Sequence, residues 1–116
     1  MSSDTGATPA VAETSDSTRT TIRWCIPGSH PVLQDHFPGH PIIPAFMQLE
    51  AVRDLIESWE GVSPGEVRFR NVKFVAPMEP DREAEIVVNR AAGRAPMSFS
   101  ISVAGEMVTR GEVSRV

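Results

Sequence analysis

One amphipathic helix followed only by alternating segments constrains the fold of this chain more than any other feature. From Ala45 to Gly61 the apolar side chains recur at spacings of three and four, which predicts one helix with one apolar face. After Gly61 the period changes to two. Strands are expected at residues 21–26, before the helix, and then at 67–70 with 72–75, 83–90, 97–103 and 106–114. This order of elements predicts an α+β fold.

The segment 97–103 shows the alternation most clearly. Apolar residues alternate there with Ser98, Ser100 and Ser102, so one face of the strand is apolar and the other carries hydroxyl groups, as in a half-covered antiparallel sheet. A single helix covers such a sheet only if the sheet curls around it, or if a partner covers the remainder. We therefore expect a wrapped helix and a dimer.

Prolines dominate the segment 29–44, which precedes the helix. Pro31, Pro38, Pro41 and Pro44 lie in it together with Gly39, so it is expected to be an extended loop or a series of turns with no helix running through it. Pro44 suits the first turn of the following helix, because its fixed φ is compatible with a helix start and its missing N–H is not needed there.

The 116 residues fit one domain and no more. Residues 1–20 are rich in Ser, Thr, Ala and acidic residues, and we expect a disordered tail there and a folded domain at 21–116. The apolar residues of the helix are assigned to the core: Phe46, Leu49, Val52, Ile56 and Trp59.

Charge and cysteine usage exclude several classes of function. The formal net charge of −4 gives no broad positive field, so no nucleic-acid or membrane partner is expected. The single cysteine, Cys25, cannot form an intramolecular disulfide and is expected to be a buried strand thiol without a function. Because no leader peptide or membrane-spanning run is apparent, we expect a soluble, cytoplasmic protein.

Two separated segments carry a family resemblance. Residues 36–51 read HFPGHPIIPAFMQLEA, and Glu50 follows His36 by 14 residues. This resembles the active-site segment of the FabZ-type 3-hydroxyacyl-acyl-carrier-protein dehydratases: His-Phe-Pro-Gly, a Pro-Gly pair, then a helix carrying Glu or Asp. Residues 71–81, NVKFVAPMEPD, resemble the later strand and turn of that family. The pair Gln48-Leu49 also resembles the ApeI-like dehydratases of aryl polyene pathways. The resemblance covers residues 21–116.

The resemblance implies a hot-dog fold, in which a sheet wraps one long helix, and a dimer with active sites at its interface. It also implies a cofactor-free dehydratase that converts 3-hydroxyacyl groups on an acyl carrier protein into trans-2-enoyl groups. By position the catalytic roles fall on His36 and Glu50, contributed by different subunits. The residues expected to bind substrate are Gly39, Phe46 and Ala45, whose backbone N–H replaces that of the family's glycine as a donor to the thioester carbonyl.

The chemistry explains why these groups are needed. Dehydration removes a proton next to the carbonyl and expels a hydroxyl group, which leaves readily only when protonated. A histidine near neutrality and a carboxyl shielded from water suit these two tasks. The negative charge that develops on the thioester oxygen suits the free N–H groups and the dipole of a helix start.

Simpler interpretations stand beside each of these assignments. Glu50 lies off the apolar stripe, so periodicity alone makes it a solvated charge, and His36 alone would be an ordinary loop histidine. His30 and His40 are assigned structural roles, because the proline-broken loop lacks the spacing of a metal site. A row of basic residues could meet an acidic carrier protein but more often marks a solvated sheet face: Arg68, Arg70 and Lys73.

Three positions depart from the family pattern. Asp35 replaces the glycine that usually precedes the histidine. Its carboxylate would raise the pKa of His36, so that less of the imidazole would be unprotonated and able to act as the base. Ala45 adds a methyl group at the mouth of the expected acyl tunnel, and Asp54 replaces a common glutamine. Two alternatives therefore stay open: a catalytically silent hot-dog subunit that binds an acyl carrier or completes a heterodimer, and a hot-dog thioesterase. The acyl chain length and the pathway, whether fatty acid, polyene or polyketide, stay open as well.

Overall fold

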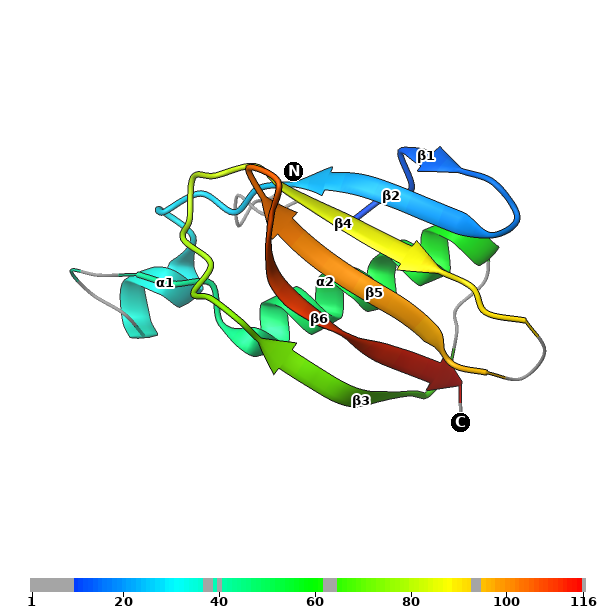
Figure 1. Ribbon diagram of the computed structural model, residues 1–116. Helices are drawn as coiled ribbons and strands as arrows, with labels where there is room; N and C mark the ends of the chain where they lie inside the picture. Colours follow the sequence, from blue (N-terminus) through cyan, green and yellow to red (C-terminus); the bar gives the residue numbers. More distant parts are fainter. Residues whose placement is uncertain (1–9, 37–38, 40, 62–64, 93–94, 116) are drawn as a thin grey trace.

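The structure is a computed structural model that describes residues 10–36, 39, 41–61, 65–92 and 95–115 (Figure 1). Six strands form one antiparallel sheet in the order β1-β2-β4-β5-β6-β3. No helix in these ranges is long and apolar enough to cross a membrane. The elements, in chain order, are β1 Thr14–Ser15, β2 Arg19–Trp24, α1 Pro31–His36, α2 Ala45–Glu60, β3 Val67–Phe74, β4 Ala84–Asn89, β5 Met97–Val103 and β6 Glu106–Arg115.

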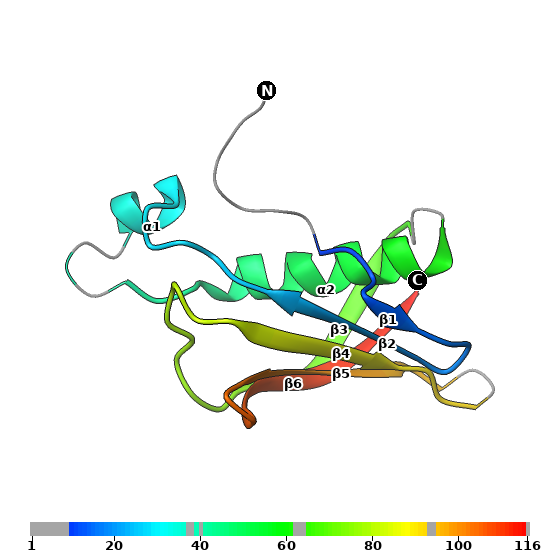
Figure 2. The ribbon, with the colours of Figure 1, turned by 90° about the horizontal axis from the view of Figure 1, so that it is seen from above.

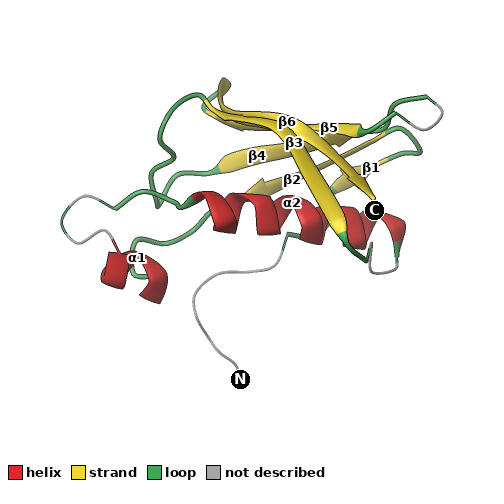
Figure 3. Cartoon of the chain, turned by 90° about the horizontal axis from the view of Figure 1, so that it is seen from below, coloured by secondary structure: helices red, strands yellow, loops and turns green. Residues whose placement is uncertain are grey.

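The long helix α2 lies along one face of the curved sheet (Figures 2 and 3). The helix begins after Pro44, as the sequence predicts, and ends at Gly61, whose φ of 78° is the left-handed conformation that glycine adopts without strain. Beside this end, Arg90 stacks over the Trp59 ring at 4.0 Å and pairs with Glu60 at 3.1 Å, and Arg115 pairs with Glu60 as well. The C-terminal end of α2 is thus tied to two separate parts of the sheet.

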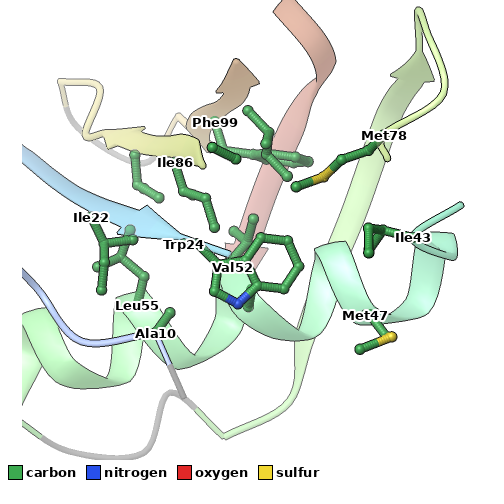
Figure 4. Close-up of a cluster of buried hydrophobic side chains, with 14 of the residues drawn as sticks. Ala10, Ile22, Trp24, Ile43, Met47, Val52, Leu55, Met78, Ile86 and Phe99 are labelled. Carbon is green, nitrogen blue, oxygen red and sulfur yellow. The ribbon is translucent and has the colours of Figure 1, made fainter. Parts of the chain in front are cut away.

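The core fills the space between α2 and the sheet (Figure 4). The predicted alternation of β5 is confirmed, because all four of its apolar side chains are buried and its three serines are exposed or half-buried. One stripe of α2 packs against this face and contains mostly apolar residues, with a single amide among them: Met47, Gln48, Ala51, Val52, Leu55 and Ile56. Burial of these apolar side chains is the main force that holds the helix on the sheet.

The chain is ordered earlier than the sequence suggests. Ala10 is 3% exposed and belongs to the core, and the backbone N–H of Glu13 donates to the carbonyl of Thr21 at 2.8 Å. The N–H of Ala12 also donates to Ser58 Oγ, on α2, at 2.9 Å. Residues 10–20 are therefore ordered despite their polar composition, because they pair with β2 and contact α2. The expected disordered tail does not extend over them. Residues 1–9 lie outside the described ranges.

A short helix, α1, lies inside the segment that the prolines were expected to keep free of helix. It fits there because Pro31 is its first residue, a position where the missing N–H costs nothing, and because no other proline follows until Pro38. Six residues between two prolines suffice for one short helix. The prolines therefore limit the length of helix in this segment without excluding one.

Two side chains expected in the core lie outside it. Cys25 is exposed, because it falls between the buried Trp24 and Ile26 on an extended segment and so points to the opposite side. Phe46 is 55% exposed, because it lies on the opposite side of α2 from the stripe that begins at Met47. Of the other helix residues assigned to the core, Val52 and Ile56 are fully buried, whereas Leu49 and Trp59 pack against its margin.

Gly111 in β6 fills a position that has no space for a side chain. A Cβ atom there would lie 2.9 Å from two ring atoms of Phe99 and 3.0 Å from Val72 Cγ2. We expect Gly111→Ala to lower the free energy of unfolding by about 1–3 kcal/mol, as overpacking of a core does. Urea denaturation measures this, with Ser98→Ala on exposed β5 surface as the control, which should change the value by less than about 0.5 kcal/mol. Equal effects of the two substitutions would contradict the prediction.

Candidate active site

The N-terminal end of α2 presents unpaired backbone donors. Pro44 is the N-cap residue, and no side chain caps the helix. The N–H groups of Met47 and Gln48 both donate to the Pro44 carbonyl, at 3.1 and 3.4 Å. Within the described ranges, the N–H groups of Ala45 and Phe46 have no hydrogen-bond partner, as expected for the first turn of a helix. Both residues are classed as exposed.

A buried polar pair lies directly behind this helix start. Gln48 is 3% exposed and Thr109, in β6, is completely buried. The Thr109 hydroxyl donates to Gln48 Oε1 at 2.5 Å, and Gln48 Nε2 donates to the carbonyl of Ile43 at 3.0 Å. The N–H of Ile43 in turn donates to the Met78 carbonyl at 2.7 Å. Both backbone polar groups of Ile43, the residue before the N-cap, therefore have hydrogen-bond partners.

An apolar groove opens beside the same helix start. Its volume is about 370 Å³, and its walls come from the segment before α2, the first residues of the helix, and the end of β3 with the loop that follows. Phe74 and Val75 are exposed there, at 47% and 60%. The lining residues are Ile42, Ile43, Pro44, Ala45, Gln48, Phe74, Val75, Ala76, Pro77 and Met78.

Glu50 is exposed on α2, on the side away from its buried stripe. Phe46, Asp54 and Glu57 follow the same side at helical spacings of three or four residues. Burial, and then the negative charges of Glu50 and Glu57, raise the pKa of the Asp54 carboxyl above its usual value, whereas Arg53 lowers it. The guanidinium of Arg53 also donates to the carbonyl of Gly65 at 2.8 Å. This side of α2 is therefore a negative surface that begins with an exposed aromatic ring.

The raised pKa of Asp54 predicts a dependence of stability on pH. The folded protein binds the Asp54 proton more tightly than the unfolded chain does, so this carboxyl lowers stability progressively as the pH rises above 3.8, its ordinary pKa. We expect Asp54→Asn to unfold like the parent near pH 3 and to be more stable at pH 7 by a few tenths to about 1 kcal/mol, since it removes a partly buried charge and its repulsion by Glu50 and Glu57. Denaturation curves at both pH values measure the free energy of unfolding. The prediction is contradicted if the difference between the variant and the parent is the same at pH 3 and at pH 7.

The short helix α1, which ends with the predicted histidine, lies beyond the N-terminal end of α2 (Figures 1 and 2). His36 is the last residue of α1, and its side chain lies outside the described part of the structure. Gly39 has a φ of 88°, a backbone conformation that favours glycine, and its role in substrate binding stays a prediction. His30 is 8% exposed and accepts the N–H of Val32 through Nδ1 at 3.2 Å. His40 lies outside the described residues.

The structure thus brings Ala45, Phe46 and Glu50 together on the first part of α2. How the His36 imidazole lies relative to Glu50 stays a prediction. Sequence reasoning gave no role to the Gln48–Thr109 pair, although one signal was available: Gln48 is a polar residue in phase with the apolar stripe, three and four residues before Ala51 and Val52. The basic residues predicted on a sheet face, Arg68, Arg70 and Lys73, are exposed. No group of metal-ligating side chains occurs among the described residues.

A curved antiparallel sheet with one long helix along its inner face is the hot-dog fold, as predicted. Solved structures share this arrangement. A chain of the dehydratase heterocomplex ApeI:P from Xenorhabdus doucetiae superposes with a TM-score of 0.76 at 17% identity, over 93% of this chain and 96% of that one. An uncharacterized protein from Erwinia carotovora subsp. atroseptica gives a TM-score of 0.68 at 21% identity, over 90% and 88%.

The family is narrower than the fold. The family model of the ApeI-like proteins, described as ApeI dehydratase, matches residues 12–112. The chain belongs to the ApeI-like dehydratase family. The match begins at residue 12, within the part of the N-terminal segment that pairs with β2.

Proposed function

We propose that this protein dehydrates 3-hydroxyacyl thioesters held on an acyl carrier protein, with His36 and Glu50 as the base and the acid. One observation carries the proposal: Glu50 is exposed on the helix whose first two N–H groups have no partner among the described residues. A carboxyl group and a pair of oxyanion donors on one rigid element supply two of the three groups that an elimination next to a thioester carbonyl requires, and the third is a base.

In this mechanism the N–H groups of Ala45 and Phe46 receive the thioester oxygen. His36 removes the proton from C2, and the negative charge that moves onto the oxygen is stabilised by the two donors and by the dipole of α2. Glu50 gives its proton to the hydroxyl group on C3, which leaves as water, and the C2–C3 double bond forms. The histidine proton then returns the carboxyl to its acid form through solvent, so no cofactor is needed.

The proposal needs a second subunit. Glu50 is exposed in a single chain, and a carboxyl group stays protonated long enough to donate only where water is excluded. A second subunit could bind where Phe74 and Val75 expose their side chains beside the groove, at the end of the edge strand β3. An apolar patch on an unpaired sheet edge favours association. We therefore expect a dimer with Glu50 and His36 of different subunits at each site.

A second candidate function is a subunit that binds the acyl carrier without turnover and completes a heterodimer. Asp54 favours it, because a carboxyl with a raised pKa stands where the family commonly has a glutamine, four residues after Glu50. The similarity to a chain of a dehydratase heterocomplex also favours a different protein as the second subunit. In that case the partner would supply the working acid and base.

The experiment offers the purified protein a 3-hydroxyacyl carrier protein, and in the reverse direction the 2-enoyl form, and follows the phosphopantetheine-bound acyl group by mass spectrometry. Loss or gain of one water supports the dehydratase. Release of the carrier thiol instead identifies a thioesterase. Carrier binding without either reaction overturns the proposal in favour of the silent subunit.

A further inference from the structure

The buried pair of Gln48 and Thr109 has no place in the proposed chemistry. Neither side chain is exposed, and neither belongs to the polar face of an element. Gln48 occupies a position in the apolar stripe of α2, where an aliphatic residue would pack as well. Replacing both partners of such a pair with apolar groups of the same shape is close to neutral for stability. Stability alone therefore does not explain why a polar pair occupies this place in the core.

The pair controls instead the backbone that precedes α2. Because Pro44 provides no side-chain cap, the start of the helix is not fixed in the usual way. Gln48 reaches back from the first turn to the Ile43 carbonyl, and Thr109 fixes the orientation of the Gln48 amide. With the bond from Ile43 N–H to Met78, this forms a chain from β6 through α2 to the loop after β3. That chain includes both backbone polar groups of Ile43, two residues before Ala45, whose N–H group has no partner among the described residues.

We propose that Gln48 and Thr109 are positioning residues that hold the Ala45 and Phe46 N–H groups where the thioester oxygen becomes negatively charged. The inference rests on the proposed dehydratase function. Its physical basis is that a buried Gln48 Oε1 without the Thr109 hydroxyl would lose its partner, so the amide would turn and release the Ile43 carbonyl. The donors would then move relative to the substrate, while Glu50, farther along the rigid helix, would stay in place.

The test compares three variants by steady-state kinetics. Thr109→Val removes the hydroxyl with almost no change of shape, and Thr109→Ser restores it. Thr20→Val is the matched control, because Thr20 is also a completely buried strand hydroxyl and bonds to Ser15 Oγ at 2.7 Å, away from the helix start. We expect Thr109→Val to lower kcat about 10- to 100-fold with KM nearly unchanged, since a misplaced donor affects mainly the transition state. Thr109→Ser and Thr20→Val should stay near the parental kcat.

Amide exchange gives a readout that does not depend on activity. The N–H of Ile43 should exchange faster in Thr109→Val than in Thr20→Val at matched global stability, when both are followed by NMR. If the parent protein is active and both valine variants have the same kcat, the inference is overturned while the proposed function stands. If the parent protein lacks dehydratase activity, the proposed function fails, and the exchange of Ile43 alone decides whether the pair holds the helix start. Unchanged exchange overturns the pair's positioning role in either case.

Discussion

We expect Glu50→Gln to lower kcat for dehydration about 10²- to 10⁴-fold, and His36→Ala to have an effect of the same order, because each would remove the proposed acid or base. Glutamine keeps the size of the side chain and cannot donate the carboxyl proton. Glu50 is exposed, so Glu50→Gln should change the free energy of unfolding by less than about 0.5 kcal/mol. Steady-state kinetics with a 3-hydroxyacyl carrier protein measure the loss.

Glu57→Gln is the matched control, since Glu57 lies two turns farther along the same side of α2. It should keep the parental kcat. Mixing the two inactive variants, His36→Ala and Glu50→Gln, adds a test of the interface. If the pair comes from two subunits, half of the randomly formed dimers contain one intact site, and roughly a quarter of the parental activity returns. No recovery after exchange of subunits would place both groups in one chain.

We expect Phe74→Glu to dissociate the proposed dimer and with it to abolish most of the proposed activity. Phe74 is 47% exposed at the end of the edge strand β3, beside the groove at the start of α2. A carboxylate placed in an apolar contact must lose its hydration without gaining a partner, which costs several kcal/mol and raises the dissociation constant by more than about 10²-fold. Sedimentation equilibrium at several protein concentrations measures this change.

The control for this substitution is Val11→Glu. Val11 is 58% exposed and lies near β1, at the opposite edge of the sheet from β3. The Val11→Glu substitution adds the same charge at an exposed apolar position, so any effect of the added charge on solubility should be the same in both variants. A variant of Phe74 that stays dimeric, or a Val11 variant that dissociates as readily, would remove β3 from the interface.

Most of the fold follows from periodicity. The spacing from Ala45 to Gly61 predicts α2 with both of its ends, and alternation predicts β4, β5 and β6. The N-terminal segment was less predictable, because its order depends on distant partners such as Ser58 and Thr21 rather than on its own apolar content. The composition of a segment shows only how much apolar surface its own side chains can bury. It does not show the pairing with β2 that mainly orders residues 10–20.

The candidate site was predictable where a residue's role follows from its place in a motif, as for Glu50 and the helix start at Ala45. The exposure of Phe46 was not, since its apolar character suggested the core. Gln48 and Thr109 lie 61 residues apart and meet only because β6 packs beside the start of α2. No pattern local to either residue contains that contact.

The two edge strands of the sheet differ in length, and this difference limits the assemblies that the protein can form. β1 has two residues, whereas β3 has eight, so only the β3 border offers a long row of free backbone groups to another chain. A subunit that can pair through only one edge of its sheet has no second edge left for a third subunit. If two copies pair through β3, assembly through this sheet would therefore stop at a dimer and would not propagate into a fibre.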